Sequence, residues 1–128
     1  MSFRCFILAE KWRRFKPKFK EIWKADVTYK DSTGHEQKGV RPCLIIKDFE
    51  ESEIVLIIPF TGNVSIVEYT PYTVKIEPDN QNKLSDNSVA MIYQIKAISK
   101  SRLKYKIGRL INAKYSEIEV LLKEIFRF

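Results

Sequence analysis

The sequence predicts a mainly β domain, a small and strongly curved β-barrel with helical cover. Two observations support this prediction. Short alternating or continuously apolar runs recur along most of the chain, as they do in β-strands, whereas helical spacing of apolar residues is found near the two ends. At 128 residues, with no repeat or Gly/Ser linker, the chain is long enough for one domain with its own core. Many short strands and one closing helix are typical of such a barrel.

Residues 1–18 are interpreted as a basic, amphipathic extension in front of a barrel domain over residues 19–128. A helix is predicted over residues 3–15, ending before Pro17. The apolar residues at roughly helical spacing in it are Phe3, Phe6, Ile7, Leu8 and Trp12. The net charge is +7, and residues 1–24 hold eight basic against two acidic residues. The remaining chain is close to neutral, so RNA binding there requires a local site.

Strands are predicted over several segments of the domain. Residues 21–28 alternate between polar and apolar side chains, as a half-buried strand does. Residues 43–46 and 54–60 are almost continuously apolar, which suits central strands buried on both faces. Further strands are predicted at 72–76 and 89–95, with a turn at 79–82 between them.

A helix is predicted from residue 117 to residue 127. Ser116 is a candidate N-cap for it. One face of this helix is apolar and is made by Ile118, Leu121, Leu122, Ile125 and Phe126.

Composition narrows the class of protein. No apolar run approaches the roughly 20 residues that span a bilayer, and nothing at the start resembles a secretory signal, so we expect a cytoplasmic protein and no membrane partner. Cys5 and Cys43 lack CxxC spacing, and with a single histidine they cannot form a typical structural zinc site. We expect Cys43 to be a buried thiol, and we expect no metal and no cofactor.

The loop before the second predicted strand concentrates reactive side chains. It reads GHEQKGVRP over residues 34–42, with Gly34 and Gly39 bracketing it and Arg41 at its end. Glycines permit a tight backbone path, and a strand starting at Pro42 would fix the Arg41 side chain. Such a loop can hold a phosphate, although a polar loop between strands is ordinarily only solvated.

In this loop and in five other stretches, the chain resembles the MazF/PemK (Kid) family of toxin endoribonucleases. The stretches agree in order and spacing across roughly residues 20–126: EIWKADV at 21–27, GHEQKGVRPCL at 34–44, IIPFT at 57–61, SVAMIYQI at 88–95, SKSRL at 99–103 and IGRL at 107–110. The resemblance implies an SH3-like barrel, normally a homodimer with a groove for single-stranded RNA. It also implies a cognate antitoxin protein whose tail occupies that groove.

RNA cleavage through the substrate's own 2′-hydroxyl needs a base, a donor for the leaving oxygen and positive charge, but no metal. Arg41 suits the charge role because a guanidinium is always protonated and can hold two phosphate oxygens. Thr61 can donate a hydroxyl hydrogen bond to the same phosphate. Both positions match residues on which the family's activity depends.

The remaining candidates are less decisive. His35 can act as acid or base or stabilise charge; it can equally be an ordinary surface histidine, but the matching histidine is implicated in catalysis in PemK/Kid-like members. Glu36 is an alternative base, or it bonds the backbone of its own loop. The residues expected to contact or position RNA are Glu36, Gln37, Lys38, Ser88 and Gln94, the last of which matches a family glutamine and can also be purely structural.

The chain also departs from the family pattern. PemK/Kid-like members carry an arginine and an aspartate, proposed as acid and base, where this chain has Met91 and Tyr93. A common aspartate is Asn87 here, and the usual glycine is Lys20. The Arg/Asp mechanism therefore cannot operate as written, whereas a version based on Arg41 and Thr61 can.

Three functions are therefore weighed. The first is a metal-independent, sequence-selective endoribonuclease toxin; the second is a catalytically silent RNA-binding or antitoxin-binding barrel; the third is a membrane-surface or nucleic-acid tether that uses residues 1–18. Together, Arg41 and Thr61 favour the first. We expect a homodimer, with apolar Val55, Ile57 and Ile66 left for a partner to cover, and base choice set by the loops at 61–72 and 81–88.

Overall fold

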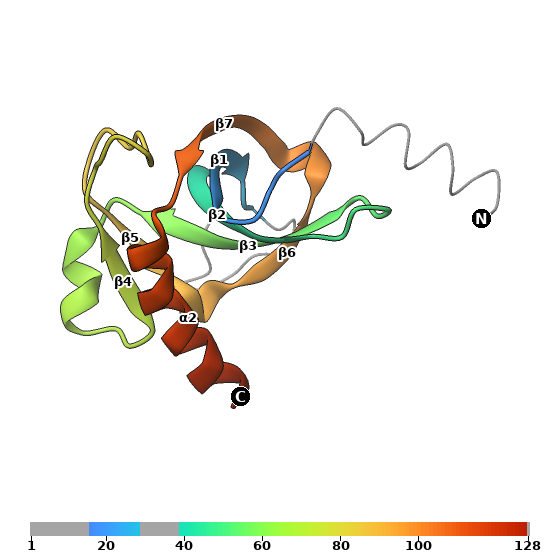
Figure 1. The fold of residues 1–128 in the computed structure, drawn as a ribbon. Helices are drawn as coiled ribbons and strands as arrows, with labels where there is room; N and C mark the ends of the chain where they lie inside the picture. Colours follow the sequence, from blue (N-terminus) through green and yellow to red (C-terminus); the bar gives the residue numbers. More distant parts are fainter. Residues whose placement is uncertain (1–15, 29–38, 128) are drawn as a thin grey trace, which may run out of the picture.

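The computed structural model describes residues 16–28 and 39–127, which form an antiparallel sheet with one long helix at the C-terminal end (Figure 1). The strands are β1 (Glu21–Asp26), β2 (Val40–Asp48), β3 (Ile54–Thr61), β4 (Thr73–Ile76), β5 (Ser88–Met91), β6 (Lys96–Ser99) and β7 (Leu103–Arg109). Three short 3₁₀ turns, η1 (Val64–Glu68), η2 (Ile92–Gln94) and η3 (Lys100–Arg102), precede the helix α2 (Asn112–Phe126). The helix predicted over residues 3–15 lies outside the described residues.

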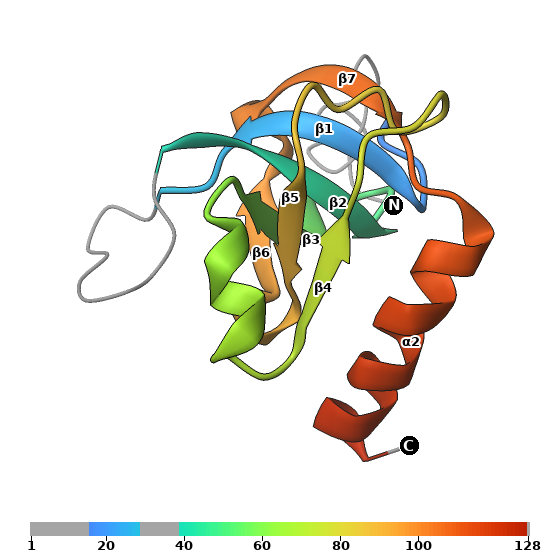
Figure 2. The same ribbon diagram turned by 90° about the vertical axis from the view of Figure 1, so that its left-hand side faces the viewer.

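The strand order is β4-β5-β3-β2-β1-β7, with β6 pairing β3 off this path. β3 is shared between two parts of the sheet, because Ile54–Ile57 pair with β6 while Phe60 and Thr61 pair with β5. Bulges in the β1–β7 and β2–β3 ladders add twist, and Figure 2 shows the resulting bend. Among the described strands, β4 and β7 stand at the two ends of this order and do not pair with each other. The sheet is therefore not closed, and the barrel is not confirmed.

The central strands are buried on both faces, as their apolar runs predicted. Leu44 and Ile58 contribute to one core cluster, against which α2 packs, while Cys43 and Ile57 contribute to a second on the opposite face. Cys43 is fully buried, which confirms the buried thiol, and burial raises the pKa of this thiol to about 12.

Local patterns located most strands but not all of them. The strands expected at 21–28, 43–46, 54–60 and 72–76 are present with shifted ends, and the turn at 79–82 is closed by Asp79, whose Oδ1 accepts hydrogen bonds from two backbone N–H groups. A single strand over 89–95 is wrong. β5 stops at Met91 because the Ile92 N–H donates to the Tyr72 carbonyl and the Ile95 N–H donates to the Ile92 carbonyl, forming η2. β6 and β7 were not predicted as strands.

The C-terminal helix begins earlier than predicted. It starts at Asn112, so Ser116 is not its N-cap; this hydroxyl lies inside the helix and donates to the Asn112 carbonyl at 3.1 Å. Ile118 is fully buried, whereas Phe126 is exposed and does not belong to the buried face. In Figure 2 the helix extends beside β4 and away from the sheet.

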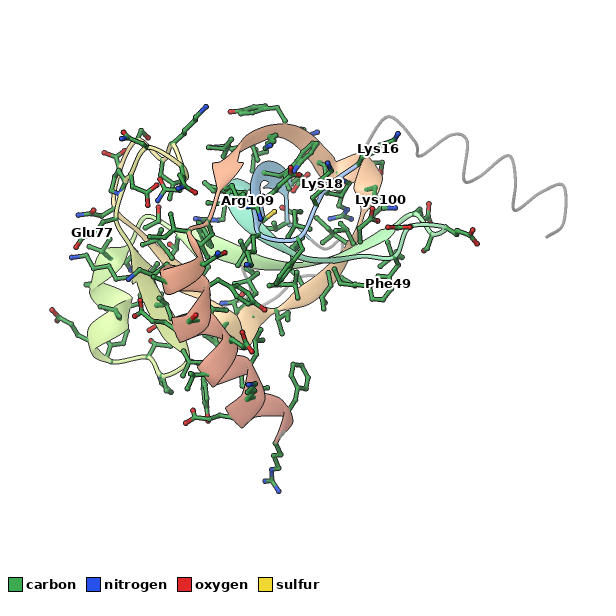
Figure 3. All side chains as sticks on the ribbon, in the orientation of Figure 1. Lys16, Lys18, Phe49, Glu77, Lys100 and Arg109 are labelled. Atoms are coloured by element: carbon green, nitrogen blue, oxygen red, sulfur yellow. The ribbon has the colours of Figure 1, made fainter. Side chains whose placement is uncertain are left out.

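The β2–β3 hairpin is anchored next to its turn by an ion pair between a buried lysine and the end of β2. Lys100, which is almost completely buried, places Nζ 2.5 Å from Asp48 Oδ1. Figure 3 labels Lys100 and Phe49 in this region, and Phe49, in the turn, is exposed. The ion pair ties the hairpin to η3.

The three apolar residues that were expected to be left exposed for a partner subunit are not exposed in the single chain. Val55 and Ile57 are fully buried in the core of the single chain, and Ile66 is half-buried on η1. These two strand residues are buried because they pack in one core cluster with apolar residues of neighbouring strands, among them Ile98 and Leu103. The exposed apolar side chains in this region are instead Val64 and Val67. In the part of the chain that is described, no helix is long and apolar enough to cross a membrane.

Candidate functional site

Arg41 and Thr61 are brought to the same end of two neighbouring strands. The β2–β3 ladder ends with Cys43 opposite Pro59, and Arg41 and Thr61 each lie two positions beyond that pair. Beyond that pair β3 pairs with β5 instead, so that Thr61 lies opposite Val89, while Arg41 pairs with Ala25 of β1. The two residues expected to act on a phosphate thus lie at the same end of neighbouring strands.

A hollow of about 460 Å³ opens beside Thr61. It is formed by the end of β3, the segment through η1 that follows it, and the end of β5. Its lining residues are Thr61, Asn63, Ile66, Tyr69, Thr70, Met91 and Tyr93. The lining combines hydroxyl, amide, aromatic and apolar groups, as does a pocket for a small planar or polar ligand.

Thr61 is oriented by the turn that follows it. The side chain is only 8% exposed, and its Oγ1 accepts a hydrogen bond from the Asn63 N–H at 3.2 Å. This bond uses an acceptor lone pair and leaves the hydroxyl hydrogen for another acceptor. Thr61 can therefore donate to a ligand in the hollow.

Gln94 joins two residues of the lining. Its Nε2 lies 3.2 Å from Tyr93 Oη and 4.0 Å from Met91 Sδ. Both contacts are local, because η2 turns the chain immediately after β5 and brings the amide back over the preceding residues. Gln94 thus supports the wall of the hollow.

Ser88, like Arg41, is not among the residues that line the hollow. It is on β5, paired with Ile76, and is nearly buried. Its hydroxyl donates to the Asp86 carbonyl at 3.5 Å, so it orders the loop in front of β5.

Four predicted site residues lie outside the described part of the chain: His35, Glu36, Gln37 and Lys38. The ends of their segment are nevertheless fixed. The Val27 N–H donates to the Gly39 carbonyl at 3.0 Å, and the Gly39 N–H donates to Thr28 Oγ1 at 2.5 Å. Because Gly39 is two residues from Arg41, the described residues on either side of this segment, Thr28 and Gly39, lie at the Arg41 end of the sheet.

Asp26 lies at this end of the sheet, near the positive charges of two basic side chains. The pKa of Asp26 is lowered by hydrogen bonds from the Thr28 backbone and side chain, and further by the charges of Arg102 and Lys104. Among residues 16–28 and 39–127, no group of three His, Cys, Asp or Glu side chains is placed to hold a metal ion.

The sequence pattern of the family described as PemK-like, MazF-like toxin of type II toxin–antitoxin system matches residues 18–126. This match covers most of the chain. The chain belongs to the PemK/MazF toxin family. An Endoribonuclease MazF from Staphylococcus saprophyticus is 34% identical over 88 residues, which are 66% of this chain and 72% of that relative.

Solved structures share the fold of the family. A MazF crystal structure from Deinococcus radiodurans has a TM-score of 0.69 at 18% identity, covering 88% of this chain and 97% of that one. A MazE–MazF structure from the same organism has a TM-score of 0.64 at 18% identity, covering 88% and 96%. An endoribonuclease with its cognate antitoxin from a mycobacterial species has a TM-score of 0.65 at 17% identity, covering 88% and 97%.

Within this PemK/MazF member, four lining residues of the hollow were not predicted as site residues from the sequence: Asn63, Ile66, Tyr69 and Thr70. The segment at 61–72 had been predicted to influence base choice, but nothing in its pattern showed which side chains turn inward. The two positions that depart from the family, Met91 and Tyr93, line the same hollow as Thr61. The departure therefore falls inside the candidate site.

Proposed function

We propose that this PemK/MazF family member is an endoribonuclease toxin that cuts single-stranded RNA without a metal ion, using the 2′-hydroxyl next to the scissile phosphate. The observation that supports it best is the position of Arg41 and Thr61 at the same end of the neighbouring strands β2 and β3, with an open hollow beside Thr61. A guanidinium and a hydroxyl donor at one strand end suit a phosphate that gains negative charge during the reaction.

Candidate residues are available for charge stabilisation and for the base. Arg41 holds the non-bridging phosphate oxygens and stabilises the charge of the phosphorane, and Thr61 donates to one of the same oxygens. His35 takes the proton of the 2′-hydroxyl, with Glu36 as the alternative base. The new bond joins O2′ to phosphorus, and the bond to O5′ breaks.

Other residues position the RNA. Glu36, Gln37 and Lys38 contact the strand from the segment between β1 and β2, and Gln94 supports the wall of the hollow. Since Ser88 is nearly buried, it affects RNA through the shape of the loop at 81–88. A single-stranded substrate is expected because its bases are accessible to a groove.

The proposal includes the finer features of the family. The bent sheet is taken as the SH3-like barrel with β3 shared between its two halves, preceded by the amphipathic extension at 1–18. The active form is a homodimer in the cytoplasm, and a cognate antitoxin blocks the RNA groove. The two solved antitoxin complexes of fold relatives support the choice of partner.

The deciding experiment incubates the purified protein with a long RNA in EDTA and maps the ends produced. Cleavage should leave a 2′,3′-cyclic phosphate, or the 3′-phosphate formed from it, and a 5′-hydroxyl. An Arg41→Ala, Thr61→Ala double variant serves as the control for contaminating nuclease. An absolute requirement for Mg²⁺ would refute the mechanism.

The same experiment tests the second candidate function, a silent RNA-binding barrel, which the apolar Met91 in the hollow favours. RNA that is bound but not cut under any condition would support it. Light scattering at micromolar concentration separately tests the homodimer, for which a monomeric mass is the contrary result.

A further inference from the structure

Tyr93 lies just beyond the end of β5 and borders the candidate site. It is in η2, directly after β5, and its ring is 44% exposed while it lines the same hollow as Thr61. The Tyr93 side chain therefore both borders the hollow and contacts Gln94. This position brings a phenol hydroxyl to the hollow that holds the proposed phosphate donor.

The contact with Gln94 determines what that hydroxyl can do. Gln94 Nε2 donates to Tyr93 Oη at 3.2 Å. A phenol oxygen that accepts a hydrogen bond from an amide still carries its own hydrogen, and this hydrogen must point away from the amide. Tyr93 is thereby set to act as a donor.

We propose that Tyr93 is a catalytic residue that protonates the leaving 5′-oxygen of RNA, with Gln94 as its positioning residue. The inference rests on the proposed function and assigns a residue to proton donation to the leaving group, a role for which the proposed function names no donor. It also leaves His35 for the base.

The protons balance in this scheme. The base takes the proton of the 2′-hydroxyl, O2′ bonds to phosphorus, and the bond from phosphorus to O5′ breaks as the phenol hydrogen moves to O5′. A phenol is a stronger acid than the alcohol that leaves, so this transfer is favourable. The phenolate then regains a proton from water, and the protonated base releases one.

The test compares two oligonucleotides under single-turnover conditions. One has the natural bond, and the other has sulfur in place of the bridging 5′-oxygen, so that its leaving thiolate needs no proton. Tyr93→Phe removes only the hydroxyl. It should slow cleavage of the natural bond by about a hundredfold or more, the scale of general acid catalysis, and leave cleavage of the sulfur-containing bond within about threefold of wild type.

Two further variants complete the test. Gln94→Leu should show the same selective loss to a smaller degree, because the phenol remains but is no longer oriented. Tyr105→Phe is the matched control, since Tyr105 is an exposed tyrosine on β7 outside the hollow, and it should react like wild type with both substrates.

Each contrary result has its own meaning. If Tyr93→Phe slows both substrates equally, the hydroxyl binds RNA rather than protonating the leaving group, and the inference is wrong. If it slows neither, Tyr93 has no part in the reaction and the inference is again wrong. If wild type cuts neither substrate although both contain the sequence mapped on long RNA, the proposed function itself fails.

Discussion

Arg41 and Thr61 lie near the same end of the neighbouring strands β2 and β3, each two residues beyond the Cys43–Pro59 pair that ends the ladder. Under the proposed function, two separate strands supply the guanidinium and the hydroxyl that act on one phosphate. A site on strands is held more rigidly than a site on loops. Because the strands should keep their positions without the Arg41 or Thr61 side chain, its loss should lower the cleavage rate and not prevent folding.

Arg41→Ala and Thr61→Ala should each lower the single-turnover rate by about a hundredfold or more, the effect of removing a preorganised donor. RNA affinity should change much less, because the interaction strengthens as charge develops on the phosphorane. Arg109→Ala is the control, since Arg109 is an exposed arginine at the end of β7. Wild-type rates in both site variants would place the reaction elsewhere on the protein.

Lys20 is a second point at which the chain departs from the family, and its backbone explains why glycine is usual there. Its φ is +72°, a left-handed conformation that costs a non-glycine residue about 1 kcal/mol. In compensation, its Nζ donates to Asn112 Oδ1 at 2.6 Å and lies 5.2 Å from the centre of the Phe19 ring. The side chain thereby connects the start of β1 to the start of α2.

Replacing Lys20 in two ways separates backbone from side chain. Lys20→Ala keeps the unfavourable φ and loses the link, so the free energy of unfolding should fall by about 1 kcal/mol. Lys20→Gly loses the link but relieves the backbone, and should remain within about 0.5 kcal/mol of wild type. Urea denaturation measures both values. An alanine variant as stable as the glycine variant would show that φ is not strained.

Gly108 is required by packing rather than by φ. A Cβ built there would lie 2.5 Å from the carbonyl oxygens of both Gln81 and Asn82, in the turn that also accepts the Arg109 N–H at 2.9 Å. Backbone atoms cannot move aside as a flexible side chain can. Gly108→Ala should therefore lower the free energy of unfolding by about 2 kcal/mol or more. Gly62→Ala meets nothing within 4 Å and should change it by less than about 1 kcal/mol.

Glu21 supplies a pH-dependent contribution to stability. Burial alone would raise the pKa of its carboxyl, but hydrogen bonds from the Lys18 N–H, the Trp23 indole and Lys106 together lower it. A carboxyl whose pKa is lower when folded stabilises the protein above its unfolded pKa of about 4.3, and this stabilisation is lost as pH falls through the folded pKa.

The stability difference between wild type and Glu21→Gln should accordingly be largest near neutral pH and shrink below about pH 4. Urea titrations at several pH values measure it. Glu51→Gln, at an exposed position of the β2–β3 hairpin, should show little difference at any pH. A constant difference for Glu21→Gln would mean that the charged form is not what the fold stabilises.

A strand or helix could be predicted from the sequence when its own residues determine it, and not when contacts with distant residues do. Continuous apolar runs identified the strands around Leu44 and Ile58 because these strands are buried on both faces. β6 has only four residues, half of them partly exposed, and has no such pattern. The early start of α2 was missed because Ile111, its N-cap, makes no side-chain capping bond.

Within the candidate site, only residues whose side-chain type itself suggests a catalytic role could be predicted from the sequence. Arg41 and Thr61 stood out by residue type and resemblance. The hollow did not, because it joins Tyr69 on one segment to Tyr93 on another, and such contacts depend on the pairing of β3 with β5 rather than on any local pattern. The role of Gln94 depended in the same way on the turn at η2.

The N-terminal extension is expected to strengthen RNA binding without choosing the sequence that is cut. Residues 1–15 contain four basic residues and one acidic residue, and contacts between such side chains and phosphates carry no sequence information. Pro17 is buried and the Lys18 N–H donates to Glu21 at 2.8 Å. A truncation should therefore remove residues 1–15, so that Pro17 and the hydrogen bond from Lys18 to Glu21 are kept.

The truncated protein should cut at the same sites as the full chain but bind RNA more weakly, and its affinity should fall less steeply with salt. Each lost phosphate contact on a single strand lowers the slope of log affinity against log salt by about 0.7. Binding titrations of the inactive Arg41→Ala variant, full length and truncated, at several salt concentrations measure this slope. A changed cut sequence would mean that the extension reaches the bases; an unchanged slope with a lower melting temperature would mean that it only stabilises the fold.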